Sequence, residues 1–374
     1  MKKKLMAILL SSMVLFGSLA GCGVTTTAPG GDKEKASGGS TAGKTIGILM
    51  PTKSSERWIK DGDDMVQGLK DLGYSTDLQY AEDTVETQVA QAENMITKGV
   101  SALVIANIDG DSLTDVCQKA KDANIPVIAY DRLIKNTANV DYYISFDNKL
   151  VGVQIGQYIE SKLNLKDTSN SKSYNIELFA GSPDDNNAHM LFDGAMSILQ
   201  PYIDSKKLVV VSGQTKFDDV CTLRWDGALA QSRMENILTA NYSSGKKVDA
   251  VMSSYDGLSR GIVEALRSVG YGSADLPWPI ITGQDAETPT VKSIIKGEQT
   301  QTTFKDTRKL SAQAVKTVDE VLKGEKVEVN DDKTYNNGVK VVPSYLCTPV
   351  SVDKDNYQKE LIDSGYIKQE DLNK

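Results

Sequence analysis

The sequence predicts an α/β protein with two doubly wound lobes, each built on a parallel sheet with helices on both faces. Short apolar runs alternate with stretches of helical period from residue 45 onward. This alternation is typical of parallel strands that are connected by helices. It begins again near residue 175, and the chain is long enough for two domains. Two consecutive series of one design therefore predict two lobes.

The first series contains apolar runs that we interpret as buried strands, at 46–50, 77–80, 102–106 and 126–130. Between them, apolar residues recur at helical spacing at 58–72, 85–96 and 113–123. The second series predicts strands at 175–180, 208–211, 250–253 and 279–282, with helices at 191–199, 228–240, 258–269 and 290–295. A last strand at 302–304 precedes a helix at 310–322, whereas the segment after Val341 has no clear pattern.

The N-terminus is typical of a secreted protein. Three lysines precede a short apolar run that ends at Phe16, which is too short to span a bilayer. The following Leu19-Ala20-Gly21-Cys22 resembles a bacterial lipobox, which implies cleavage before Cys22 and acylation of its thiol. An ordinary signal with a chance cysteine is the alternative. We expect a signal peptide at 1–21, a flexible tether at 22–44 and an extracytoplasmic, lipid-anchored protein.

Composition argues against several classes of function. The chain has 50 acidic and 42 basic residues and no basic block, so nucleic acid is not an expected partner. Cys117, Cys221 and Cys347 are an odd number without close pairing, so we expect buried thiols and no disulfide framework. The single histidine, His189, and the absence of G-x-S-x-G, zinc-spaced and Walker motifs predict no catalytic residues, metal or cofactor. Composition alone leaves hydrolysis by paired carboxylates open.

Polar residues follow the predicted strands of both series. Ligands of open parallel sheets bind beyond the carboxyl ends of the strands. Helix capping is the alternative for each Asp or Asn in these positions, and we favour it for Asp147 and Asp306. Capping does not explain Arg57, Arg132 and Lys305, because the helix dipole disfavours cations at an N-terminus. The polar residues concerned are Arg57, Asp131, Arg132, Asp184, Asp185, Asn186, Asn187, Tyr255, Asp256, Gln284, Asp285 and Lys305.

A ligand rich in hydroxyl groups fits this mixture, because a hydroxyl both donates and accepts hydrogen bonds. Trp58 and Trp225 stand beside these polar residues and could stack on the C–H faces of a pyranose. Packing in the core is the alternative for both rings. Composition does not exclude an amino acid ligand.

These segments together resemble a known family, the periplasmic-type sugar-binding proteins of ABC transporters, especially the D-xylose-binding and multiple-monosaccharide-binding members. The resemblance extends from about Thr45 to the C-terminus. It implies the type I periplasmic-binding-protein fold, with two α/β lobes joined by a hinge of three strand crossings. By that pattern the lobes comprise 45–146 plus 306–336 and 147–305 plus 337–374. The segments that carry it are 50–58, 93–96, 129–132, 145–148, 181–188, 283–286, 304–306, 337–340 and 342–344.

The resemblance also implies roles for individual residues. Many relatives carry Asn-Asp where this chain has Tyr255-Asp256, so Tyr255 is expected to offer a hydroxyl or a ring face, and Asp256 either a contact or only a helix cap. The expected sugar-binding residues are Arg57, Trp58, Asp131, Arg132, Asn187, Trp225, Asp285 and Lys305, together with Asn186, Asp185, Tyr255 and Asp256.

The expected function is reversible capture of a pyranose aldose, such as xylose, glucose, galactose or arabinose, for delivery to an ABC transporter permease. We expect a monomer that performs no chemistry and that needs no cofactor. A receptor signalling to a sensor kinase or chemoreceptor would use the same site. A sugar-responsive repressor conflicts with the secretion signal, and a secreted carbohydrate enzyme is a further alternative. The sequence leaves the physiological sugar open.

Overall fold

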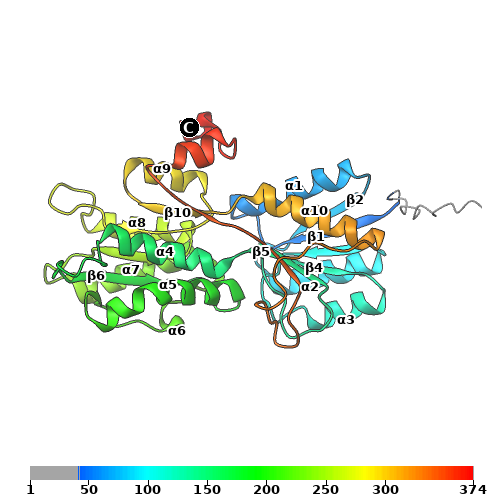
Figure 1. The fold of residues 1–374 in the computed structure, drawn as a ribbon, viewed down its shortest axis with the longest axis horizontal. Helices are drawn as coiled ribbons and strands as arrows, with labels where there is room; N and C mark the ends of the chain where they lie inside the picture. Colours follow the sequence, from blue (N-terminus) through cyan, green and yellow to red (C-terminus); the bar gives the residue numbers. More distant parts are fainter. Residues whose placement is uncertain (1–40, 42, 374) are drawn as a thin grey trace, which may run out of the picture. The chain divides into compact units, whose positions relative to one another are not determined.

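The computed structural model describes residue 41 and residues 43–373 (Figure 1). The expected signal peptide, the expected lipid-modified Cys22 and most of the expected tether lie outside the described residues. Among the residues that are described, no helix is both long and apolar enough to cross a membrane.

The first lobe is a six-stranded parallel sheet in the order β11-β5-β4-β3-β1-β2. Side chains of β1 alternate between its two faces, so Ile48 packs toward α1 and α10 and Leu49 toward α2 and α3. Figure 1 shows these helix pairs on opposite faces of the sheet. The strands are β1 (Thr45–Met50), β2 (Ser75–Tyr80), β3 (Ala102–Ile105), β4 (Val127–Tyr130), β5 (Tyr142–Phe146) and β11 (Ser344–Cys347), and the helices are α1 (Glu56–Asp71), α2 (Val85–Thr97), α3 (Thr114–Asp122) and α10 (Thr307–Lys323).

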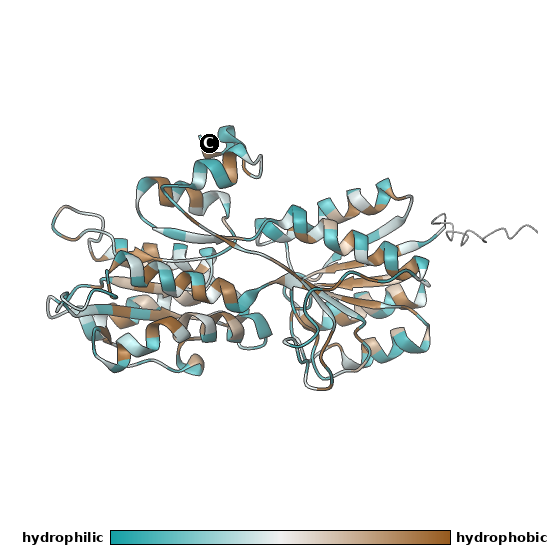
Figure 2. Cartoon of the chain, in the orientation of Figure 1, coloured by the Kyte–Doolittle hydropathy of each residue, from teal (hydrophilic) through white to brown (hydrophobic). Residues whose placement is uncertain are grey.

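The second lobe has a four-stranded parallel sheet in the order β7-β6-β8-β9. Helices α4 and α5 cover one face and α7 and α8 the other, each with its own apolar cluster. Figure 2 shows the apolar residues gathered on the strands and on the inward sides of the helices. The elements are β6 (Tyr174–Phe179), β7 (Leu208–Val210), β8 (Ala250–Ser253), β9 (Ile280–Ile281), α4 (Asn148–Lys162), α5 (Asn186–Asp204), α6 (Phe217–Val220), η1 (Leu223–Trp225), α7 (Gly227–Ile237), η2 (Leu238–Tyr242), α8 (Asp256–Ser268) and α9 (Thr288–Lys296).

The predicted fold class is confirmed, and each predicted strand forms within about two residues of its expected ends. Helix α4 was not predicted. Val151, Ile155 and Ile159 recur at helical spacing on its buried face, but Gly152 and Gly156 share that face, so the contrast between its apolar and polar faces is weak. The expected helix at 228–240 begins as α7 and ends in the π-helical turn η2.

The chain crosses between the lobes after β5, after β10 (Gln301–Phe304) and after β11. We expected residues 337–374 in the second lobe, and this boundary is wrong. Strand β11 pairs in parallel with β5, and Val342 is buried in the first core. Without β11, β5 would leave a sheet edge with unpaired backbone groups. The chain returns only at β12 (Val350–Asp353), which pairs antiparallel with β10; the turn η3 (Gln358–Asp363) and helix α11 (Gln369–Leu372) follow.

Helices α4 and α5 pack backbone against backbone because glycines stand at their contact. A Cβ atom at Gly152 would lie 1.9 Å from the carbonyl oxygen of Leu191, and one at Gly194 would lie 2.2 Å from that of Lys149. Neither glycine can gain a side chain unless the helix axes separate. The glycines therefore fix the spacing of two helices that both begin at the edge of the sheet facing the first lobe.

Replacing Gly152 with alanine should lower the free energy of unfolding by about 2 kcal/mol, because overpacking costs about 3 kcal/mol and the better helix propensity of alanine returns about 1 kcal/mol. Urea unfolding followed by circular dichroism measures this difference. Gln157→Ala, at an exposed position of the same helix, is the matched control and should change stability little. Equal stability of Gly152→Ala and the unmodified protein would contradict the packing argument.

Candidate binding site between the two lobes

A cavity of about 580 Å³, including its open mouth, lies where the carboxyl ends of the strands of both lobes meet. It is lined by Thr52, Ser54, Ser55, Arg57, Trp58, Asp83, Asp131 and Arg132 of the first lobe, by Asp185, Asn187, Arg224, Trp225, Tyr255, Gln284 and Asp285 of the second, and by Lys305 of the crossing after β10.

The guanidinium group of Arg57 is the central charge of the site. It is 4% exposed and pairs with Asp61 (3.1 Å), with Asp131 and with Asp285 (3.4 Å). Lys305 adds a second cation, 2.9 Å from Asp285. Buried charges are tolerated only when they are paired and hydrogen-bonded, and here the partners come from both lobes. The Arg57–Asp285 contact therefore joins the lobes at the cavity.

Asp131 is held in a left-handed backbone conformation (φ 58°) at the end of β4. Its carbonyl oxygen accepts hydrogen bonds from the Tyr143 hydroxyl (2.6 Å), the Ser145 hydroxyl (2.8 Å) and the Asn187 amide (2.7 Å). Burial alone would raise the pKa of Asp131, but Arg57 and Lys305 hold that pKa below its usual value. The carboxylate is thus presented as a charged acceptor.

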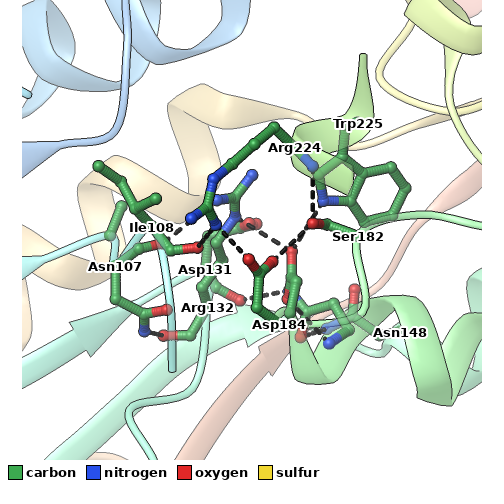
Figure 3. A network of polar contacts seen from close by, with 12 residues as sticks. Asn107, Ile108, Asp131, Arg132, Asn148, Ser182, Asp184, Arg224 and Trp225 are labelled. Atoms are coloured by element: carbon green, nitrogen blue, oxygen red, sulfur yellow. Dashed lines mark hydrogen bonds and ion pairs between the residues drawn. The ribbon is translucent and has the colours of Figure 1, made fainter. Parts of the chain in front are cut away.

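Asp185 connects a cation to an indole at the opposite wall. Its carboxylate lies 3.1 Å from Nε of Arg132 and accepts a hydrogen bond from Nε1 of Trp225 (3.2 Å). Arg132 also donates to the carbonyl oxygen of Asn107 at 3.2 Å. Figure 3 shows Arg132 and Trp225 in this polar network. Burial raises the pKa of Asp185, although Arg132 acts in the opposite direction.

The indole of Trp225 lies directly on a glycine. A Cβ atom at Gly181 would meet the ring atoms at 2.0–2.3 Å, so only glycine leaves room for this ring. The ring of Tyr255 stands edge-on to Trp225, with centroids 6.0 Å apart. Trp58 is arranged differently, because the guanidinium groups of Arg57 and Arg132 lie over its ring at 4.6 and 5.2 Å. Trp225 and Tyr255 form the aromatic wall of the cavity in the second lobe.

Most of the predicted site residues line the cavity, and two do not. Asn186, the first residue of α5, is outside the lining. Asp256 is fully buried below it, where it accepts hydrogen bonds from the backbone of Glu287, from Gln299 and from Thr302. Asp256 therefore supports the loop around Asp285, and it caps no helix, since no side-chain cap is formed at the start of α8. The capping interpretation is confirmed for Asp147 and Asp306.

Five residues line the cavity but were not predicted, namely Thr52, Ser54, Ser55, Asp83 and Arg224. Arg224 pairs with Asp184 and donates to the carbonyl oxygen of Ile108 in the first lobe at 3.5 Å. Figure 3 shows this side chain reaching toward Asp184 and Ile108. Arg224 has a φ of 56° in a short turn rather than at a strand end, so the rule for parallel sheets does not indicate it. The polar stretch 223–226 was the feature of the sequence that could have indicated Arg224 as a site residue.

The cavity offers a mixture of charged acceptors, charged donors, amides and ring faces. His189 lies elsewhere, stacked on Phe217 and bonded to the carbonyl oxygen of Pro183. Cys117 and Cys347 are buried free thiols in the first core, and Cys221 is half-buried. The charged groups, amides and ring faces of the cavity are of the kind that bind a polar, uncharged ligand through many hydrogen bonds.

Comparison with known proteins shows which family has this arrangement of two lobes and a cavity. Residues 46–326 match the periplasmic binding protein domain family. The chain is 58% identical to the multiple sugar-binding periplasmic receptor ChvE of Rhizobium radiobacter (88% of this chain, 92% of the relative). It is 39% identical to the D-xylose-binding periplasmic protein of Escherichia coli K12 (87% and 92%). A solved ABC transporter solute-binding protein from Clostridium phytofermentans with bound β-D-glucose superposes with a TM-score of 0.85 at 48% identity (88% and 100%).

Asp61 gives the structure a specific pH dependence. Burial raises the pKa of Asp61 from 3.8 to about 6, although Arg57 and a hydrogen bond from Tyr130 oppose the shift. The folded state therefore binds the proton more tightly than the unfolded state. The stability from this group is complete below pH 3.8 and is lost as the pH rises through 6.

Relative to Asp61→Asn, the unmodified protein should lose about 2 kcal/mol of unfolding free energy between pH 4 and 7. Chemical denaturation at several pH values measures the difference. Asp71→Asn, at an exposed carboxylate near the end of the same helix, should show no such slope. A constant difference between the unmodified protein and Asp61→Asn would contradict the assignment.

Replacing Gly181 with alanine should displace the Trp225 indole, because the new methyl group would occupy the position of the ring. The near-ultraviolet circular dichroism spectrum of Gly181→Ala should then differ from that of the unmodified protein in most of the ways in which the spectrum of Trp225→Phe differs from it. A spectrum of Gly181→Ala identical to that of the unmodified protein would show that the ring does not lie on this glycine.

Proposed function

This chain belongs to the periplasmic binding protein family, and on that premise we propose that it is an extracytoplasmic receptor that captures a monosaccharide and delivers it to an ABC transporter. One observation carries the proposal. Charged and amide groups from the strand ends of both lobes converge on one cavity beside an indole ring. The relative from Clostridium phytofermentans, with bound β-D-glucose, supports this interpretation.

The proposed ligand is a pyranose aldose, such as glucose, xylose, galactose or arabinose. Each hydroxyl of such a sugar needs both a donor and an acceptor. Asp131 and Asp285 supply charged acceptors, while Arg132, Asn187 and Lys305 supply donors. The exposed part of the Trp225 ring offers a surface for the C–H face of the sugar.

Closure of the lobes follows from where these groups stand. A ligand shifts an equilibrium between open and closed forms only through its different affinity for the two. A sugar in the cavity would bind Asp131 of the first lobe and Asp285 of the second at once, which is possible only in the closed form. We propose that the permease recognises this form.

We further propose that the mature protein is a monomer tethered to the membrane by lipid on Cys22. A second role, as a receptor that reports the sugar to a signalling partner, is favoured by one observation: the relative from Rhizobium radiobacter is named a receptor. Both roles use the same cavity, so capture of a permease or of a sensor by the sugar-loaded protein would separate them.

Isothermal titration calorimetry against xylose, glucose, galactose, arabinose and ribose tests the proposal directly. At least one aldose should bind with a single site. Asp285→Ala should weaken that binding by about 30-fold or more, because it removes an acceptor and leaves Arg57 and Lys305 without their shared partner. Trp225→Ala should weaken it through lost stacking.

Asp204→Ala, at an exposed position at the end of α5, is the matched control and should bind normally. Asp285→Ala and Trp225→Ala proteins that bind every aldose as tightly as the unmodified protein would refute the site. Conversion of any sugar to a product would favour an enzyme instead.

A further inference from the structure

A buried carboxylate connects the two lobes immediately behind the cavity. Glu287 is 5% exposed and lies just before α9. Its Oε1 accepts hydrogen bonds from the hydroxyls of Ser55 (2.9 Å) and Tyr255 (2.8 Å), and its Oε2 pairs with Arg260 at 2.6 Å. Glu287 does not line the cavity, but Ser55 and Tyr255 both do. The carboxylate therefore touches one cavity residue of each lobe.

The Ser55 hydroxyl does not have the helix-capping role that its position predicts. Ser55 is the N-cap residue of α1, where a serine side chain normally accepts a hydrogen bond from the first turn of the helix. No such cap is formed here, and the hydroxyl donates to Glu287 in the other lobe instead. Next to it, Thr288 donates to Glu56 at 3.3 Å. These two bonds exist only while α1 and the start of α9 are in contact.

Tyr255 is held at both ends. Its hydroxyl donates to Glu287, so the residue presents its ring rather than a free hydroxyl to the cavity. A Cβ atom at Gly257 would lie 2.3 Å from Cε1 of this ring, so the ring occupies space that only glycine leaves open. The edge-on contact with Trp225 completes the wall. Glu287 therefore fixes the hydroxyl end of the side chain, while Gly257 and Trp225 contact its ring.

We propose that Glu287 is a positioning residue for sugar binding: a single carboxylate oxygen both holds Tyr255 against the ligand and bonds Ser55 when the lobes close. The proposal rests on the proposed function and goes beyond it, because Glu287 touches no ligand. Closure and the shape of the aromatic wall are coupled through this oxygen. Loss of the Glu287 carboxylate therefore accelerates release of the sugar more than it slows association, since the hydrogen bond with Ser55 forms only after the lobes meet.

Stopped-flow tryptophan fluorescence with D-glucose, or with the aldose that the unmodified protein binds best, measures both rate constants. Ser55→Ala, Tyr255→Phe and Glu287→Ala should each raise the dissociation rate constant by about tenfold, the usual effect of losing a hydrogen bond to a charged group. The association rate constant should change by less than about threefold. The Ser55→Ala/Glu287→Ala double variant should release sugar no faster than Glu287→Ala alone.

The second lobe offers matched controls. Glu160 is another buried carboxylate that accepts a tyrosine hydroxyl, from Tyr202 at 2.7 Å, and pairs with a lysine, but it lies away from the cavity. Tyr202→Phe and Glu160→Ala should leave both rate constants unchanged, even where they lower thermal stability. A purely structural role of Glu287 would instead make its variant behave like these controls.

The outcomes separate the two proposals. An unmodified protein that binds no monosaccharide refutes the proposed function. An unmodified protein that binds sugar, with Ser55→Ala and Tyr255→Phe at unchanged dissociation rates, refutes the role of Glu287 alone. Effects of Ser55→Ala and Glu287→Ala that multiply in the double variant would also refute it, because they would show that Ser55 acts directly on the sugar.

Discussion

The structure depends on how a buried guanidinium group is neutralised. Arg57 has lost nearly all contact with water, and its three carboxylate partners come from its own helix, from the end of β4 and from the second lobe. Removing such partners is costly because the charge would remain buried. The same ion pairs that stabilise Arg57 therefore also place Asp131 and Asp285 beside the cavity. The carboxylates that line the cavity and the ion pairs that stabilise Arg57 therefore belong to one network.

Backbone conformation contributes a second constraint. Asp131, Arg224, Trp225 and Asp285 all have positive φ values, which residues other than glycine rarely adopt. Such conformations persist where the surroundings hold them, and they gather at functional sites. At Asp131 the surrounding donors are visible, because three side chains bond its carbonyl oxygen. Gly181 has the complementary role, since it leaves room for the ring of Trp225.

Much of the fold follows from local pattern. Buried strands such as β3 and β4 are uninterrupted apolar runs, and Asp131 and Arg132, which follow β4, line the cavity, as the rule for parallel sheets predicts. The failures have physical causes. The two faces of helix α4 differ little in polarity because glycines share its buried face, and β11 is defined by its pairing with β5, which no local sequence pattern indicates. Asp256 has the residue type of a ligand contact, but its hydrogen bonds point to a neighbouring loop.

The glycine contact between α4 and α5 has a consequence for movement. Helix α4 starts directly after the crossing at β5, and α5 starts at the cavity, where Asn148 of the first helix donates to Asn187 of the second at 3.0 Å. Because backbone atoms of the two helices lie against each other at these glycines, we expect the pair to move as one unit when the backbone rotates at the crossing. Such a rotation would also move the amide of Asn187 at the cavity.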